Sequence, residues 1–227
     1  MLLAWGVHLF TASGAVLAAV ALHAVHRGGF GLASLLMLAA LVVDSVDGTL
    51  ARRVGVAEAV PGIDGRRLDD IVDYLNYVIV PVVFLLALGA LPHWIFAVAP
   101  VLASAYGFSQ RDAKTDDDFF LGWPSYWNVV AIYIWLLDLS PWAATAWVHF
   151  FALAVFVPLK YIYPSKLRVV RGPTLWLACG WGALLVTPIF FPALRDAAFP
   201  FVEVSLLFPA YYVGVSAWLG DWFGLRA

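Results

Sequence analysis

The sequence predicts an all-α integral membrane protein, folded as a single bundle of about eight transmembrane helices. Hydrophobic residues make up 63% of the chain and charged residues only 12%, and the mean hydropathy is +0.89. A soluble domain is roughly 45–50% apolar and about 25% charged, so an aqueous core cannot hide this much apolar surface. The second observation is a series of apolar stretches near about 20 residues, the length that crosses a bilayer as a helix.

Eight such stretches follow one another along the chain. They span about residues 2–25, 29–50, 69–91, 93–110, 126–139, 142–160, 174–192 and 200–220. The fifth is short, and Asp138 and Pro141 separate it only weakly from the sixth. No Lys or Arg precedes the first stretch, so we expect it to be a retained helix rather than a secretory signal. No internal repeat or long linker is found, which predicts one domain over residues 1–227.

The distribution of basic residues orients the bundle. With eight spans, one set of connections, including the C-terminal tail, carries eleven of the thirteen Lys and Arg residues, and the opposite set carries two, Arg27 and Arg195. The eleven are Arg52, Arg53, Arg66, Arg67, Arg111, Lys114, Lys160, Lys166, Arg168, Arg171 and Arg226. Because cytosolic connections of membrane proteins are enriched in Lys and Arg, both termini and the 51–68 loop are expected in the cytosol.

Charge and cysteine content exclude several other classes of protein. The net charge of -2 gives no reason to expect a nucleic-acid partner. A single cysteine, Cys179, rules out an intrachain disulfide and a zinc site made of cysteines alone. The five histidines, among them His8, show no spacing typical of metal ligands, and we assign none of them to a site.

Four aspartates stand where an apolar helix should be uninterrupted. Asp44 and Asp47 end the second stretch three residues apart, and Asp69 and Asp73 open the third four residues apart. Either spacing puts the pair on one helical face. A charge in a spanning helix costs about 2.5–3.5 kcal/mol near the bilayer centre and less near its ends, so these aspartates indicate function.

The short connection makes these two helices antiparallel neighbours, so all four carboxylates should meet at one membrane border. At close range they would repel one another or stay protonated unless divalent cations neutralise them. Oxygen ligands suit Mg²⁺, Ca²⁺ or Mn²⁺. The structural alternative is that the aspartates form ion pairs at the helix ends with nearby arginines. Those arginines are Arg52, Arg53, Arg66 and Arg67.

The aspartates belong to a longer pattern, D-x2-D-G-x2-A-R from Asp44 to Arg52 and G-x3-D-x3-D from Gly65 to Asp73. This pattern resembles the signature of the CDP-alcohol phosphatidyltransferases. The spacer between its halves, residues 53–64, is longer than is usual in that family. The resemblance implies an enzyme that transfers a phosphatidyl group from CDP-diacylglycerol to an alcohol and releases CMP, at the cytosolic membrane border.

The resemblance also implies a role for each residue of the signature. Two divalent cations, Mn²⁺ or Mg²⁺, would be the cofactors, a pair suited to an in-line displacement. Asp44, Asp47 and Asp69 would hold the first metal, and Asp69, Asp73 and Asp44 the second. Asp73 would also be the general base that removes the alcohol proton.

Five further residues would bind CDP-diacylglycerol by the same resemblance. They are Thr11, Gly48, Ala51, Arg52 and Gly65. A glycine lets the backbone approach a ligand closely, and an arginine can neutralise a phosphate. Each has a structural alternative: glycines also pack membrane helices, threonine can bond a neighbouring helix, and arginine can extend to the membrane surface.

Four other stretches resemble one branch of the family, the bacterial phosphatidylcholine synthases. They are His8–Gly14, Asp73–Tyr77, Phe119–Ala131 and Tyr161–Lys166. This branch implies choline as the alcohol, membrane lipids as surroundings, the bacterial inner membrane as location and a homodimer as assembly.

Choline carries a permanent positive charge that aromatic faces can hold. The candidate choline-binding residues are Tyr74, Tyr77, Tyr126, Trp127, Tyr161 and Tyr163. The alternative is that they belong to the aromatic belts found at membrane borders. Aromatic residues are 16% of the chain, so chance proximity to the site is a real alternative for each.

Other functions remain open from the sequence. Serine, inositol or glycerol phosphate could be the acceptor, and Arg66 and Arg67 would favour an anionic one. A cation transporter would continue polar residues through the bilayer, whereas these helices return to Val, Leu and Ala after the aspartates. A purely structural protein leaves the four aspartates unexplained.

Overall fold

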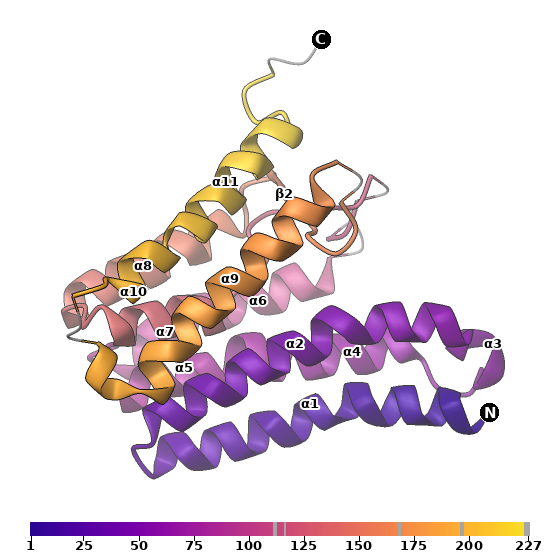
Figure 1. The fold of residues 1–227 in the computed structure, drawn as a ribbon, viewed down its shortest axis with the longest axis horizontal. Helices are drawn as coiled ribbons and strands as arrows, with labels where there is room; N and C mark the ends of the chain where they lie inside the picture. The colour runs from indigo at the N-terminus through magenta and orange to yellow at the C-terminus, as the bar shows by residue number, and fades with distance from the viewer. Residues whose placement is uncertain (111–112, 116, 168, 196–197, 225–227) are drawn as a thin grey trace.

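The computed structural model describes residues 1–110, 113–115, 117–167, 169–195 and 198–224, which form a bundle of helices (Figure 1). In chain order the elements are α1 (Leu2–His26), α2 (Phe30–Val54), α3 (Val56–Ala59), α4 (Gly65–Tyr74), the π-helical segment η1 (Leu75–Ile79), α5 (Val80–Ala87), the 3-10 turn η2 (Trp94–Ala97), α6 (Val98–Ser109), β1 (Phe119–Leu121), α7 (Trp127–Leu136), α8 (Pro141–Ala154), β2 (Lys160–Ile162), α9 (Arg171–Phe190), the 3-10 turn η3 (Pro192–Leu194), α10 (Phe201–Ser205) and α11 (Leu207–Leu219).

The first two helices form an antiparallel hairpin closed by a short turn (Figure 1). Gly28 in that turn has a φ of +72°, which a residue without a side chain adopts without strain. Small residues such as Ala21 of α1 and Ala33 of α2 are buried, and small side chains let membrane helices approach closely. The hairpin sets the beginning of α1 beside the end of α2, where Asp44 and Asp47 lie.

The third apolar segment is a continuous helical run, Gly65–Ala87, that begins earlier than the predicted residue 69. Asp64 caps its start by accepting a hydrogen bond from the Arg67 backbone N–H at 3.1 Å. The run widens into a π-helix at η1, just before Pro81. A proline cannot donate to the carbonyl four residues earlier, that of Tyr77, and its ring crowds that carbonyl, which accounts for the wider turn.

Five helical runs are long and apolar enough to cross a membrane. They are Leu2–His26, Phe30–Val54, Gly65–Ala87, Arg171–Phe190 and Phe201–Leu219. The predicted segments 93–110, 126–139 and 142–160 are also helical, but α6, α7 and α8 contain only 12, 10 and 14 residues. The structure therefore supports a multi-pass helical membrane protein, and the count of eight spans stays a prediction.

The core forms around α7, which contacts α2, η1 and α5. Trp127, Ala131 and Ile132 of α7 are fully buried. Among the described residues, one small sheet departs from the all-α prediction. Its strands β1 and β2 are antiparallel, with Phe119 opposite Ile162. The sheet joins the connection after α6 to the connection after α8, so it fixes two loops that the sequence leaves independent.

The two ends of the bundle differ in charge. Figure 1 shows the N-terminus, α3, β2 and the end of α11 toward one end, and the α1–α2 turn and α10 toward the other. The first end carries the connections rich in Lys and Arg, whereas Arg27 and Arg195 follow α1 and η3 at the opposite end. Arg111, Arg168 and Arg226 lie outside the described residues. The grouping agrees with the predicted topology, which remains to be tested.

Cysteine labelling in intact cells tests that topology. In a Cys179→Ala background, Glu58→Cys in the α3 region should resist an impermeant thiol reagent and react only after permeabilisation. Ala193→Cys, an exposed position in η3 at the opposite end, is the matched control and should react in intact cells. Ready labelling of Glu58→Cys in intact cells would contradict a cytosolic 51–68 loop.

Candidate active site

Three carboxylates meet between α2 and α4, two helices that both pack against α1. One oxygen from each of Asp44, Asp47 and Asp69 lies within 4.8 Å of the other two. Asp47 is buried, and the other two are half-buried. Carboxylates this close repel one another, and their oxygens suit a divalent cation such as Mg²⁺ or Mn²⁺. The donor set therefore fits a cation held between the two helices.

The alternative of helix-end ion pairs is not what the structure shows. Among the described residues, the ion pairs join Arg67 to Asp64, Lys160 to Asp117 and Lys166 to Asp118. None of the four signature aspartates takes part in one.

Two hydroxyl groups fix the carboxylates of α2. Thr11 of α1 donates a hydrogen bond from Oγ1 to Asp47 Oδ2 at 2.8 Å. Tyr77 of η1 donates from its hydroxyl to Asp44 Oδ2 at 2.6 Å. Each bond orients its carboxylate, and partners of this kind around a metal ligand help to set metal affinity.

The π-helical segment is what brings Tyr77 to Asp44. Within the same segment, Asn76 donates from Nδ2 to the backbone oxygens of Gly14 at 2.9 Å and Val72 at 3.0 Å. This buried amide ties η1 to α1. The π-helical turn is therefore held in place by the contact between Asn76 and α1. It directs Tyr77 toward the acidic cluster and Asn76 toward α1.

A small cavity of about 110 Å³ adjoins the cluster. Asp44, Asp70 and Asp73 lie in its wall. Asp73 is not one of the three clustered carboxylates, and it stands one helical turn after Asp69 on the side of this cavity. The cavity therefore gives Asp73 access to a small molecule bound beside the cluster.

The rest of that wall is largely aromatic. It contains Tyr77, Phe108, Phe120, Trp123, Tyr126 and Tyr163. The Tyr77 and Tyr126 rings lie 5.9 Å apart between centroids, and Phe120 stacks on Tyr163 at 4.6 Å. Burial, reinforced by the nearby carboxylate of Asp44, raises the pKa of Tyr163 above its usual range, so this phenol stays neutral. Such a wall suits a weakly hydrated organic cation.

Three of the six candidate choline-binding residues line this cavity: Tyr77, Tyr126 and Tyr163. The structure places the other three elsewhere. The Tyr74 hydroxyl donates to the Val101 carbonyl at 3.1 Å, and the Tyr161 ring packs 4.9 Å from that of Trp222.

Trp127, the last of the six, is fully buried, and its indole N–H donates to Ser104 Oγ at 2.7 Å.

The aromatic residues of the cavity wall that the sequence did not predict are Phe108, Phe120 and Trp123. The last two fall within the stretch 119–131, whose resemblance to known enzymes was the available signal. Phe108 carried no signal of its own.

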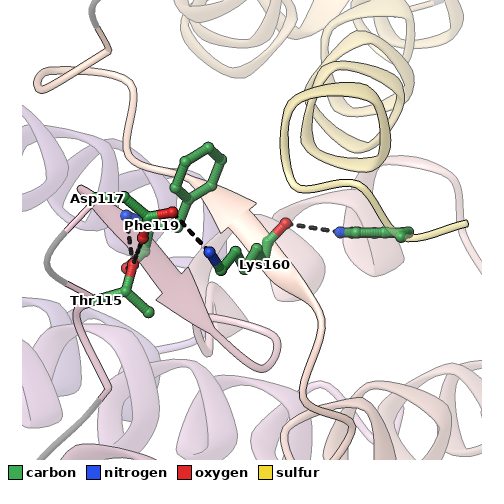
Figure 2. A network of polar contacts seen from close by, with 5 residues as sticks. Thr115, Asp117, Phe119 and Lys160 are labelled. Atoms are coloured by element: carbon green, nitrogen blue, oxygen red, sulfur yellow. Dashed lines mark hydrogen bonds and ion pairs between the residues drawn. The ribbon is translucent and has the colours of Figure 1, made fainter. Parts of the chain in front are cut away.

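A strap covers this cavity; it consists of the described residues 113–115 and 117–122. Figure 2 shows how it is held: Lys160 of β2 donates to Asp117 Oδ2 at 2.6 Å, and Thr115 hydrogen-bonds to Asp117 and Phe119. The Lys160 ammonium lowers the pKa of Asp117, so the carboxylate stays charged and the pair persists at neutral pH. The Trp222 indole N–H binds the other side of Lys160, at its carbonyl oxygen.

The acidic run 116–118 is thus partly explained as an anchor of the strap. Asp117 pairs with Lys160, and Asp118 lies 3.5 Å from Lys166. Asp116 lies outside the described residues. At the end of the strap, Gly122 has a φ of +82°, and a Cβ there would stand 2.3 Å from the Val155 carbonyl oxygen. Only glycine fits at this position without a shift of the backbone.

The strap also brings a basic side chain to the cavity. Lys114 lines it together with Arg66 of α4, and Lys114 pairs with Phe120 through a backbone bridge. The charge of Lys114 acts through space on all four signature aspartates. The wall of the cavity therefore combines aromatic rings and carboxylates with two cationic groups.

A larger cavity of about 900 Å³ lies on the other side of the cluster. It contains all five candidate nucleotide-binding residues in its wall: Thr11, Gly48, Ala51, Arg52 and Gly65. Asp47 and Asp69 also face it, whereas Asp44 and Asp73 face the smaller cavity. The carboxylates thus form a partition that two different ligands can approach from opposite sides.

The chain is similar in sequence to known proteins over most of its length. The profile of the CDP-alcohol phosphatidyltransferase family matches residues 7–158. A phosphatidylcholine synthase of Legionella pneumophila is 44% identical over 168 residues, which cover 72% of this chain and 66% of that protein. Phosphatidylcholine synthases of Borreliella burgdorferi and Pseudomonas aeruginosa are 35% and 36% identical, over 96% and 97% of this chain and 95% and 94% of those proteins.

The hydrogen bond from Tyr77 to Asp44 predicts an effect on metal affinity. Tyr77→Phe keeps the ring in the cavity wall but frees the carboxylate, so about ten times more Mn²⁺ or Mg²⁺ should be needed for half-maximal activity. Titration of the metal in purified protein measures this. Tyr126→Phe is the matched control, because it removes a hydroxyl from the same wall without touching Asp44. An unchanged metal requirement in Tyr77→Phe would show that this bond does not support a metal ligand.

Proposed function

The chain belongs to the CDP-alcohol phosphatidyltransferase family, and on that premise we propose that it transfers the phosphatidyl group of CDP-diacylglycerol to choline. The products are phosphatidylcholine and CMP. The observation that carries the proposal is the acidic partition, with the signature residues for a nucleotide on one side and an aromatic cavity on the other. The names of these relatives favour choline as the alcohol.

CDP-diacylglycerol binds in the larger cavity in this proposal. Gly48 and Ala51 leave room for the nucleotide along α2, and Arg52 reaches a phosphate from the same helix face. Gly65 lets the start of α4 come close to the ligand. Thr11 holds the Asp47 carboxylate in place through its hydrogen bond from α1. The diacyl tails extend into the surrounding lipid.

Two divalent cations, Mg²⁺ or Mn²⁺, complete the site. Asp44, Asp47 and Asp69, whose oxygens lie within 4.8 Å of one another, would hold the first, and Asp69, Asp73 and Asp44 would hold the second. Bound there, the metals supply charge neutralisation for the diphosphate and for the departing CMP.

The acceptor approaches from the smaller cavity. The choline hydroxyl oxygen forms a bond to the phosphorus that carries the diacylglycerol group, and the bond from that phosphorus to the CMP oxygen breaks. Asp73 lines the smaller cavity and takes the proton that the hydroxyl loses. The CMP leaves with the electron pair of the broken bond, so charge and atoms balance.

The aromatic wall supplies the selectivity for choline. Tyr77, Tyr126 and Tyr163 face the cavity, and cation–π contacts of about 0.5–2 kcal/mol each do not demand a buried counter-ion. We infer that Phe120 and Trp123 join them because they stand in the same wall.

A second acceptor is favoured by one specific observation. Lys114 and Arg66 line the same cavity, and cationic groups attract an anion such as glycerol phosphate more than they attract choline. Serine and inositol remain alternatives of the same chemistry. In the choline proposal, Arg66 instead faces the phosphates of the lipid donor, because its side chain lines both cavities.

We further propose that the chain lies in a bacterial inner membrane, with both termini and the site at the cytosolic border. This rests on the charge difference between the ends of the bundle. A homodimer is proposed from the family resemblance.

An assay of CMP release with a panel of alcohols tests the acceptor. With CDP-diacylglycerol and Mn²⁺, choline should give faster release than ethanolamine, serine, inositol or glycerol phosphate at equal concentration. Lys114→Gln should not raise the KM for choline, since the lysine repels the like charge of choline. Faster release with glycerol phosphate, abolished in Lys114→Gln, would replace choline by an anionic acceptor.

Substitution of the aspartates tests the chemistry. Asp73→Asn should lower kcat by about 10²–10⁴, the usual contribution of a general base, with a smaller effect on the KM for either substrate. Asp44→Ala, Asp47→Ala and Asp69→Ala should nearly abolish turnover because they remove metal ligands. Asp70→Asn is the control, adjacent to Asp69 but outside the cluster, and should be milder. Near-normal kcat in folded Asp73→Asn would remove this residue from proton transfer.

A further inference from the structure

His8 stands in the wall of the larger cavity without a role in the signature. It lies on α1, one helical turn before Thr11, and only 8% of its surface is exposed. Its ring meets Trp5 edge to face at 6.2 Å. On another side it packs against the start of α4, where a Cβ on Gly65 would stand 3.3 Å from His8 Cε1.

The Nε2 atom of His8 is buried and has no hydrogen-bond partner. Among the described residues, only one other buried side-chain atom shares this state, Thr145 Oγ1 of α8, which lies in neither cavity wall. Buried polar groups in folded proteins nearly always have a partner, so an unpaired one calls for an explanation. At a cavity wall, the simplest explanation is a ligand that supplies the missing bond.

The position of His8 along α1 indicates which part of a nucleotide it would meet. Thr11 touches Asp47, and His8 lies about 4.5 Å closer to the N-terminus at 1.5 Å per residue. Because α2 is antiparallel, the same direction leads from Asp47 to Ala51. His8 is therefore level with Ala51 and Gly65, beyond the carboxylates that would hold the metals and the diphosphate.

We propose that His8 is a nucleotide-binding residue whose Nε2 forms a hydrogen bond with the cytidine nucleoside, at a ribose hydroxyl or the base edge. The inference rests on the proposed function, since that function places a CDP-lipid in this cavity. An imidazole suits either partner because each ring nitrogen donates or accepts according to tautomer. Gly65 then has a second role beside its closeness to the ligand, because the absence of a side chain leaves space for the His8 ring.

Equilibrium binding of CMP to the purified full-length protein, in Mn²⁺, tests this contact. His8→Phe keeps the ring volume but removes Nε2, so CMP should bind about tenfold more weakly, the loss expected for one hydrogen bond. The KM for CDP-diacylglycerol should rise by a similar factor while the KM for choline stays unchanged. His8→Gln, whose amide can reach the position of Nε2, should restore most of the affinity.

Two controls separate the contact from a general disturbance. His26→Phe changes an exposed histidine at the far end of the same helix and should leave CMP binding unchanged. Inorganic pyrophosphate, used as a competing ligand, lacks a nucleoside and should bind wild type and His8→Phe equally. If His8→Phe weakens pyrophosphate as much as CMP, the nucleoside contact is overturned.

A second route does not rely on replacing histidine by phenylalanine. Gly65→Ala should weaken CMP binding more in the wild-type background, where it also displaces the His8 ring, than in a His8→Ala background, where the ring is absent. Equal effects of Gly65→Ala in both backgrounds would overturn the proposal. If wild type binds CMP and folded His8→Phe binds it equally, the role of His8 falls and the proposed function stands. If wild type binds no CMP, both fall.

Discussion

The arrangement of this molecule depends on holding three carboxylates together at the edge of an apolar bundle. Asp44, Asp47 and Asp69 have oxygens within 4.8 Å of one another on helices whose other faces are suited to lipid. Mutual repulsion and burial both oppose this state unless a cation binds. The surrounding contacts hold the carboxylates in this arrangement. Thr11 and Tyr77 each fix one carboxylate by a hydrogen bond, and α1 packs against both helices that carry the cluster.

The cluster divides two cavities of different chemistry. The larger one is bounded by α1, α2 and α4 and by the loop between the last two, all close in sequence. The smaller one is bounded by η1, the strap and residues near β2, which lie far apart in sequence. The larger cavity is thus built from local structure, and the smaller one from long-range contacts.

The backbone is irregular where a side chain or a loop of the site takes a direction that a regular helix does not allow. The π-helical turn before Pro81 aims Tyr77 at Asp44, and Asn76 secures that turn against α1. Gly122 allows the strap to approach the Val155 carbonyl, and the Lys160–Asp117 pair in Figure 2 anchors the strap to β2. Each irregularity costs some local stability, and each lies beside one of the two cavities.

The sequence alone was sufficient for features with a local period or spacing. Helical character and membrane composition follow from the apolar stretches, and the grouping of Asp44 with Asp47 follows from the helical repeat. The shared cavity of Thr11, Gly48 and Gly65 followed from a resemblance whose motifs lie on adjacent helices. The number of spans was less secure, because composition does not tell a short, partly buried helix such as α7 from a spanning one.

Only the tertiary structure decided which aromatic side chains face the smaller cavity. Tyr74 and Tyr77 are neighbours in sequence, yet the π-helical turn sends one to the Val101 carbonyl and the other to Asp44. Lys114 and Phe120 reach the cavity because β1 pairs with β2 across about 40 residues. Likewise, the unpaired nitrogen of His8 is visible only once α1 is packed on α4. Spacing fixes neighbours on one helix, whereas side-chain direction between distant segments depends on packing that no local pattern encodes.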